Sequence, residues 1–132
     1  LVVDDDPVFS RIAKRCAMVA FAGAELEVTR ARTGEAALRN SQQVLPQLLL
    51  LDFHLPGMNG VEVLSRIRAL PGGETVSVVV MSGVVGAAER WRFSSLGVRD
   101  FINKPVEFDL LVATILRKGH ERGWISRNEE SS

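Results

Sequence analysis

The chain has 132 residues, which fits one domain whose core is stable without disulfides or structural metals. Basic and acidic residues number 16 each, so no net charge favours binding to nucleic acid or to an anionic membrane surface. The one cysteine, Cys16, excludes an internal disulfide and fits a reducing, cytoplasmic location, with Cys16 itself buried on a helix. No apolar run is long enough to cross a bilayer. Because Leu1 already lies in a strand-like run, we expect the natural chain to begin further upstream.

Strand-like and helix-like patterns alternate along the first third of the chain. Residues 1–3 are apolar and end in acidic residues, which predicts a short strand. Asp6 followed by Pro7 predicts the start of a helix that reaches about residue 22. The residues predicted to form its inward stripe are Val8, Ile12, Cys16 and Val19. The alternation around Leu26 and Val28 predicts an edge strand, and Thr33 predicts the cap of a short helix to about residue 41.

The middle of the chain contains two runs that are typical of buried strands. Residues 48–52 combine four leucines with Asp52, and residues 76–81 are rich in valine, so both runs predict strands covered on both faces. Between them, Asn59 and Glu62 have the spacing of a capping box for a helix that ends before Pro71.

The last third predicts a helix at residues 86–95, a short strand at 101–102 and an amphipathic helix at 106–121. The inward residues predicted for this last helix are Leu110, Leu111, Thr114 and Ile115. Residues 123–132 are expected to form a polar tail or linker. Five alternating strand and helix units predict an α/β fold with a parallel sheet, in which ligands bind beyond the carboxyl ends of the strands.

Chemically reactive side chains follow four of the predicted strands. In chain order they are Asp4, Asp5 and Asp6, then Asp52, then Ser82, and finally Lys104. Clustered carboxylates repel one another, and a hard divalent cation such as Mg²⁺ relieves that repulsion. One carboxylate can then attack phosphorus, while an ammonium and a hydroxyl contact phosphate oxygens. The acidic run alone is also explained by stabilisation of the positive end of the helix that follows it. The predicted phosphoryl chemistry therefore depends on the combination of carboxylates, hydroxyl and ammonium.

The sequence resembles the receiver domain of two-component response regulators from its start to about residue 122. The matching segments are residues 1–6, 52–60, 81–83 and 97–105, of which the loop after Asp52 and the Lys104-Pro105 pair are the most specific. The resemblance implies a receiver domain over residues 1–122. It also implies a flavodoxin-like (βα)5 sandwich whose five parallel strands have the order 2-1-3-4-5, an order for which a receiver domain is a standard example.

The resemblance also implies a role for each site residue. Asp52 is the expected phosphoacceptor, and Lys104, joined to Pro105 by a cis bond, is expected to contact the phosphate. The expected Mg²⁺ ligands are Asp5, Asp52 and the backbone carbonyl of His54, with Asp4 acting through a water molecule.

The expected switch consists of Ser82, which moves toward the phosphate, and Phe101, which turns inward behind it. Their movement is expected to alter the surface formed by the fourth helix, the fifth strand and the fifth helix. The implied donor is a histidine kinase or a histidine phosphotransfer protein, and the implied recipient is an effector domain or a downstream protein. Direct binding of nucleic acid or membrane is not expected, and a homodimer stays open.

Trp91 and Phe93 are bulkier than usual for the family. Either Phe93 packs in the core or the fourth helix is displaced, and a half-buried position is expected for Trp91.

Two alternatives stay open at this point. In a haloacid-dehalogenase-like phosphatase, Asp4 would be the nucleophile and Asp6 the general acid, with Ser82 and Lys104 as supporting residues. In a receiver-like interaction module, no residue would be phosphorylated. The favoured interpretation is a phosphoacceptor domain that catalyses only its own phosphotransfer and dephosphorylation, and is not otherwise an enzyme.

Overall fold

The structure is a computed structural model that describes residues 1–83 and 85–125. Its centre is a five-stranded parallel sheet with the order β2-β1-β3-β4-β5, as predicted. The strands are β1 (Val2–Val3), β2 (Arg30–Ala31), β3 (Leu48–Asp52), β4 (Ser77–Ser82) and β5 (Asp100–Asn103). The helices are α1 (Pro7–Ala20), α2 (Gly34–Gln43), α3 (Gly60–Arg68), α4 (Ala87–Ser95) and α5 (Phe108–Glu121), with a 3₁₀ turn at Gly73–Thr75.

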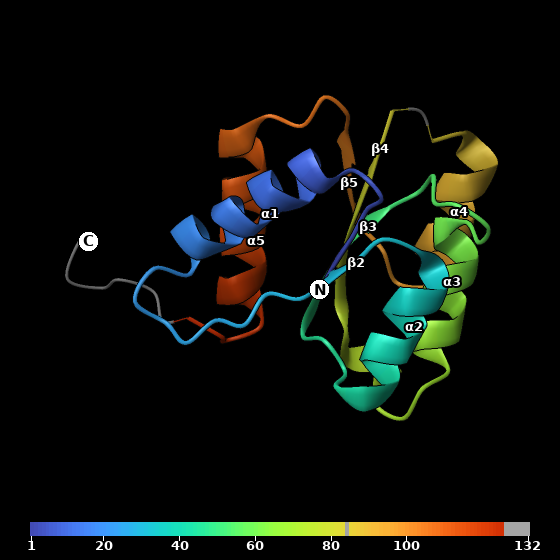
Figure 1. Ribbon diagram of the computed structural model, residues 1–132, viewed down its shortest axis with the longest axis horizontal. Coiled ribbons are helices and arrows are strands. Elements are labelled where there is room, and N and C mark those ends of the chain that lie inside the picture. The colour runs from blue at the N-terminus through green and yellow to red at the C-terminus, as the bar shows by residue number, and fades with distance from the viewer. Residues whose placement is uncertain (84, 126–132) are drawn as a thin grey trace.

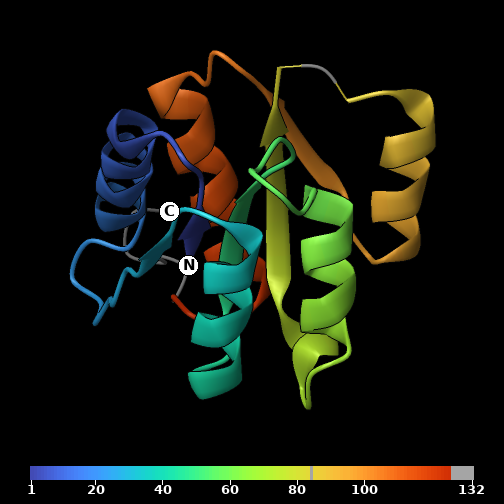
Figure 2. The ribbon, with the colours of Figure 1, turned by 45° about the vertical axis from the view of Figure 1, so that its right-hand side comes forward.

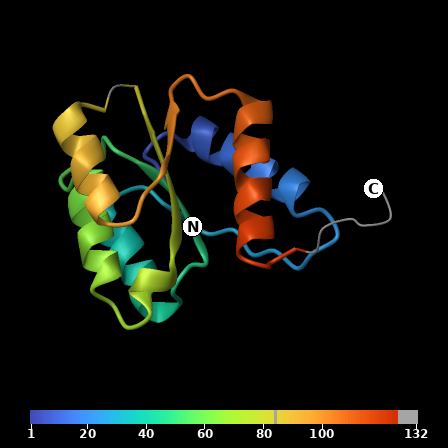
Figure 3. The same cartoon turned by 180° about the vertical axis from the view of Figure 1, so that it is seen from behind.

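The helices cover both faces of the sheet, which explains why the central strands are mostly apolar. Helices α1 and α5 lie on one face, and α2, α3 and α4 lie on the other (Figures 1 and 3). Alternate strand residues point to opposite sides, so Leu50 and Val79 belong to the α1–α5 core, whereas Leu49 and Val80 belong to the other core. The carboxyl ends of β4 and β5 lie at the same edge of the sheet, toward the top of Figure 2.

Three of the predicted helix starts are confirmed by side-chain caps. Asp6 accepts a hydrogen bond from the backbone N–H of Val8 at 2.9 Å, and Thr33 accepts one from Ala36 at 3.1 Å. Asn59 accepts one from Glu62 at 2.9 Å. Because a cap pairs a backbone donor that would otherwise lack a partner, these short polar residues place the starts of α1, α2 and α3.

The predicted inward stripe of α1 is wrong in three of its four residues. Val8, Ile12 and Val19 are 54%, 40% and 50% exposed, and only Cys16 is buried. The buried face instead consists of Phe9, Ser10, Ala13, Cys16, Ala17 and Ala20. Apolar residues surround most of this helix, so periodicity alone could not select the face. The face with the smaller side chains packs inward, where α1 lies against α5 (Figure 3).

Two further predictions need correction at the edges of the fold. The segment around Leu26 and Val28 is not a strand. The edge strand β2 consists only of Arg30 and Ala31, which pair with Val2 and Val3 of β1. Leu110, predicted to point inward, is 49% exposed. Within the segment predicted as a tail, Trp124 and Ile125 are partly buried and pack against the α1–α5 core. The rest of that tail, residues 126–132, lies outside the described residues.

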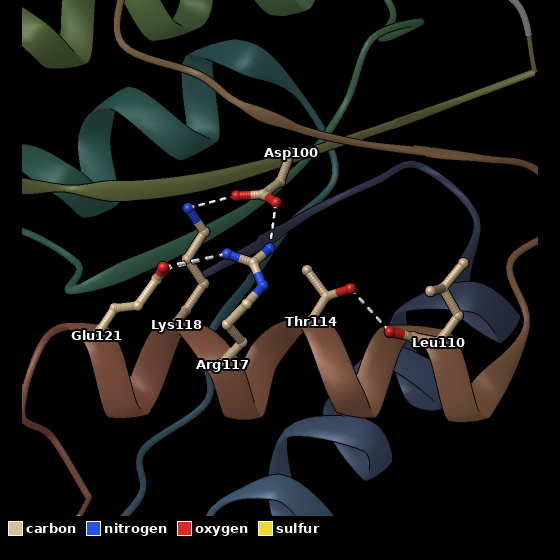
Figure 4. Close-up of polar contacts among 6 residues, drawn as sticks. All are labelled: Asp100, Leu110, Thr114, Arg117, Lys118 and Glu121. Atoms are coloured by element: carbon tan, nitrogen blue, oxygen red, sulfur yellow. Dashed lines mark hydrogen bonds and ion pairs between the residues drawn. The ribbon is translucent and has the colours of Figure 1, made fainter.

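An ion-pair cluster ties α5 to the start of β5. Asp100 of β5 pairs with both Arg117 and Lys118 of α5, and Arg117 also contacts Glu121 at 3.1 Å (Figure 4). Burial alone would raise the pKa of Asp100, but the hydrogen bonds from Lys118 and Arg117 outweigh it and lower the pKa below its usual value. The cluster therefore holds a charged carboxylate between the strand and the helix.

A partly buried arginine connects elements on the other side of the sheet. Arg68, the last residue of α3, donates hydrogen bonds to the backbone carbonyls of Leu96, Gly73 and Val76 at 2.9, 2.8 and 2.6 Å. It thereby links the end of α4 to the start of β4. No helix in the described ranges is long and apolar enough to cross a membrane.

Candidate functional site

Three carboxylates meet at the carboxyl ends of β1 and β3. Val3 pairs with Leu51, so the next residues along the two strands, Asp4 and Asp52, lie side by side. One oxygen from each of Asp4, Asp5 and Asp52 lies within 4.8 Å of the others. Asp4 and Asp52 are 1% and 4% exposed, whereas Asp5 is exposed to solvent. The structure therefore confirms that these acids cluster, with one of them open to solution.

Lys104 reaches into this cluster from the end of β5. Its backbone N–H donates to the carbonyl of Ser82 at 2.9 Å, and the bond to Pro105 is cis, as expected. Its Nζ lies 2.9 Å from Asp4 Oδ2 and 3.3 Å from Asp52 Oδ2. One ammonium thus bridges two carboxylates that belong to neighbouring strands.

The two aspartates next to Lys104 are held differently. Asp4 is engaged at both oxygens, because Oδ1 accepts a hydrogen bond from the Asp6 N–H at 2.8 Å and Oδ2 faces Lys104. In Asp52, Oδ1 accepts a longer bond from the His54 N–H at 3.2 Å. The contacts of Asp4 are therefore shorter than those of Asp52.

The electrostatics of the cluster suit a bound cation. Burial and the Asp4 carboxylate raise the pKa of Asp52, and the opposing effect of Lys104 and the His54 N–H is smaller. For Lys104, burial lowers the pKa, but its hydrogen bond to Asp4 and the charges of Asp52 and Asp4 outweigh burial and raise it. A hard divalent cation would favour the ionised form of Asp52, and carboxylate oxygens are the ligands that such cations prefer.

The predicted switch residues lie on β4, which pairs with β3, and on β5, which pairs with β4. Ser82 is the last residue of β4, is 1% exposed and is opposite Asn103 of β5. Phe101 of β5 is partly buried, with the Arg90 guanidinium 4.9 Å from the centre of its ring.

The rings of Phe53, Phe93 and Phe101 form a row from the loop after Asp52 to β5. This row shows where the bulky α4 residue Phe93 packs. Phe93 is fully buried, so the core position is correct for it. Its ring packs edge-to-face on Phe53 and on Phe101, each at 5.9 Å between ring centroids. Trp91 is 72% exposed, so the half-buried position expected for it is wrong.

Phe9 is a residue at the site that the sequence reasoning missed. The Lys104 Nζ lies 4.8 Å from the centre of its ring. The inward stripe predicted for α1 began at Val8 and did not include Phe9. The sequence does place this aromatic residue three positions after Asp6, less than one helical turn beyond the acidic run.

A family model described as the response regulator receiver domain matches residues 1–116. The chain belongs to this family. Domains of the family are phosphoacceptor signalling domains and not classical enzymes, and this receiver domain is a phosphoacceptor switch of the two-component type. This membership overturns the phosphatase alternative.

Relatives support the same conclusion. A protein of Leptolyngbya boryana described as an uncharacterized 14.6 kDa protein is 35% identical over 107 residues, which cover 81% of this chain and 79% of that protein. The transcriptional regulatory protein KdpE of Mycobacterium tuberculosis is 30% identical over 87% of this chain, which spans only 48% of KdpE. The solved structure of a CheY-like receiver domain protein from Methanospirillum hungatei has a TM-score of 0.79 and 27% identity, covering 93% of this chain and 94% of that one.

Proposed function

We propose that this receiver domain accepts a phosphoryl group on Asp52 from a phosphohistidine of a histidine kinase or a phosphotransfer protein. The observation that carries the proposal is the setting of the Asp52 carboxylate. It lies at a strand end with one oxygen held by the His54 N–H and the other 3.3 Å from the Lys104 ammonium. Asp5 lies beside it and is open to solvent.

In the proposed transfer, an Asp52 oxygen forms the new bond to phosphorus while the bond from phosphorus to the imidazole nitrogen breaks. The electron pair of that bond stays on the nitrogen, and the ring leaves as a neutral imidazole because its other nitrogen carries a proton in the reacting phosphohistidine. The Lys104 ammonium offsets charge on a phosphoryl oxygen, and the Ser82 hydroxyl donates a hydrogen bond to another.

Asp5, Asp52 and the backbone carbonyl of His54 would hold Mg²⁺, with Asp4 acting through a water molecule. When bound, Mg²⁺ supplies further charge neutralisation at the phosphoryl group. The close approach of three carboxylate oxygens supports this assignment.

The proposed output is a change at the surface formed by α4, β5 and α5. Ser82 would move toward the phosphoryl group and Phe101 would turn inward, and the packing of Phe101 on Phe93 would transmit this movement to α4. The recipient is an effector domain or a downstream protein, with a homodimer as an open arrangement. We assign the receiver domain to residues 1–122 and a cytoplasmic location to it, with no direct binding of nucleic acid.

The test is to incubate the protein with acetyl phosphate and Mg²⁺ and to measure the intact mass. We expect the mass of one phosphoryl group to be added, and we expect chelation of Mg²⁺ by EDTA to prevent the addition. Asp52→Asn should abolish it. Asp109→Asn is the matched control, because it makes the same change at an exposed carboxylate in the first turn of α5.

Two results would contradict the proposal. If the wild-type mass stays unchanged, the chain is a receiver-like interaction module without phosphorylation. If Asp52→Asn is still phosphorylated and Asp4→Asn is not, the nucleophile is Asp4.

A further inference from the structure

An aromatic ring forms one wall around the Lys104 ammonium. Phe9 lies in the first turn of α1, is 9% exposed, and presents its ring with the centroid 4.8 Å from Lys104 Nζ. The other contacts of the ammonium are Asp4 Oδ2 at 2.9 Å and Asp52 Oδ2 at 3.3 Å. The ammonium is therefore held by two carboxylates and one ring.

The start of α1 determines where this ring lies. Asp6 caps the helix and Pro7 is its first residue, so Phe9 follows the acidic cluster by less than one turn. Phe9 is anchored in the core shared with Leu50, Met81 and Ile102. The ring is thus fixed by packing, whereas the lysine side chain beside it has a flexible four-carbon stem.

A ring face and a carboxylate hold an ammonium in different ways. The ring attracts the cation through its quadrupole and uses no hydrogen-bond acceptor, so it restricts the position of Nζ without occupying its N–H groups. A lysine has three of these groups, and two carboxylates take two of them here. The third is then available for an oxygen of an incoming phosphoryl group.

We propose that Phe9 is a positioning residue for phosphoryl transfer, because its ring holds the Lys104 ammonium where it can meet the phosphoryl group on Asp52. This inference rests on the proposed function. Phe9 does not touch the reacting atoms and acts only through Lys104. Loss of the ring lets the lysine side chain sample positions away from Asp52 and slows the transfer.

The test measures the initial rate of phosphorylation by acetyl phosphate with Mg²⁺ in the full chain. In this reaction an Asp52 oxygen bonds to phosphorus and acetate leaves with the electron pair of the broken bond. Phe9 is replaced by leucine, which removes the ring, and by pentafluorophenylalanine, which keeps its shape and reverses the charge of its face. We expect both changes to lower the rate about three- to ten-fold, as for a partly desolvated cation–π contact.

A double-mutant cycle with Lys104→Gln shows whether Phe9 acts through the lysine. We expect Phe9→Leu to have no further effect on the rate in the Lys104→Gln background. Phe21→Leu is the matched control, because Phe21 is a similarly buried phenylalanine at the other end of α1 that contacts Trp124. It should lower the urea midpoint and leave the rate unchanged.

Each outcome separates this inference from the proposed function. An unchanged rate with pentafluorophenylalanine, or an equal loss from Phe9→Leu with and without Lys104, overturns the role of Phe9 alone. If Lys104→Gln itself leaves the rate unchanged, the role proposed for Lys104 fails, and the inference about Phe9 fails with it.

Discussion

Phe93 should be the side chain on which the attachment of α4 depends most. It is the one buried residue of α4 (Ala87–Ser95), it is fully buried, and it packs edge-to-face on two other rings. Replacing a buried phenylalanine by alanine costs about 3–5 kcal/mol, and the two ring contacts place this site near the upper end. Because small domains are stable by only about 5–15 kcal/mol, Phe93→Ala should bring the protein close to unfolding.

A milder change tests the same reasoning in a protein that stays folded. Phe93→Leu keeps an apolar side chain but removes both ring contacts, so we expect a loss of about 1–3 kcal/mol in the free energy of unfolding by urea. Hydrogen exchange should also become faster in α4 than in α5. The matched control is Trp91→Ala on the same helix, which removes a larger but 72% exposed ring.

Trp91→Ala should change the free energy of unfolding by less than about 0.5 kcal/mol. An equal loss for Phe93→Leu and Trp91→Ala would refute the reasoning, because burial would then not determine the cost. A stability of Phe93→Ala within about 1 kcal/mol of wild type would refute it as well.

The remaining predictions concern stability. Removing the cap of α3 by Asn59→Ala should lower the free energy of unfolding by about 1 kcal/mol, because the Glu62 N–H loses its acceptor; an unchanged urea midpoint would contradict this. The pKa of Asp100 is lower in the folded protein than in the unfolded chain, so its ion pairs stabilise the fold above a pH of about 4. That contribution is lost as the pH falls through the folded-state pKa. Asp100→Asn should therefore lose less stability than wild type on acidification, and parallel acid-unfolding curves would exclude this role.

The local elements of the fold were predictable because their signals are local. The leucine run before Asp52 and the valine run before Met81 each lie in one strand. Asp6, Thr33 and Asn59 cap helices through backbone N–H groups two or three residues away. The members of the acidic cluster were predictable as well, because parallel strands bring their carboxyl ends to one edge of the sheet.

Only the tertiary structure decided which faces are buried and which remote side chains meet. Lys104 and Asp4 are 100 residues apart along the chain, and their contact at 2.9 Å depends on two strands that are not neighbours in the sheet. The face of α1 that is buried depends on its packing against α5, and no pattern within the α1 sequence predicts that face. The contact between Phe9 and Lys104 could therefore be found only in the tertiary structure. The face that a helix buries depends on its neighbours as much as on its own sequence.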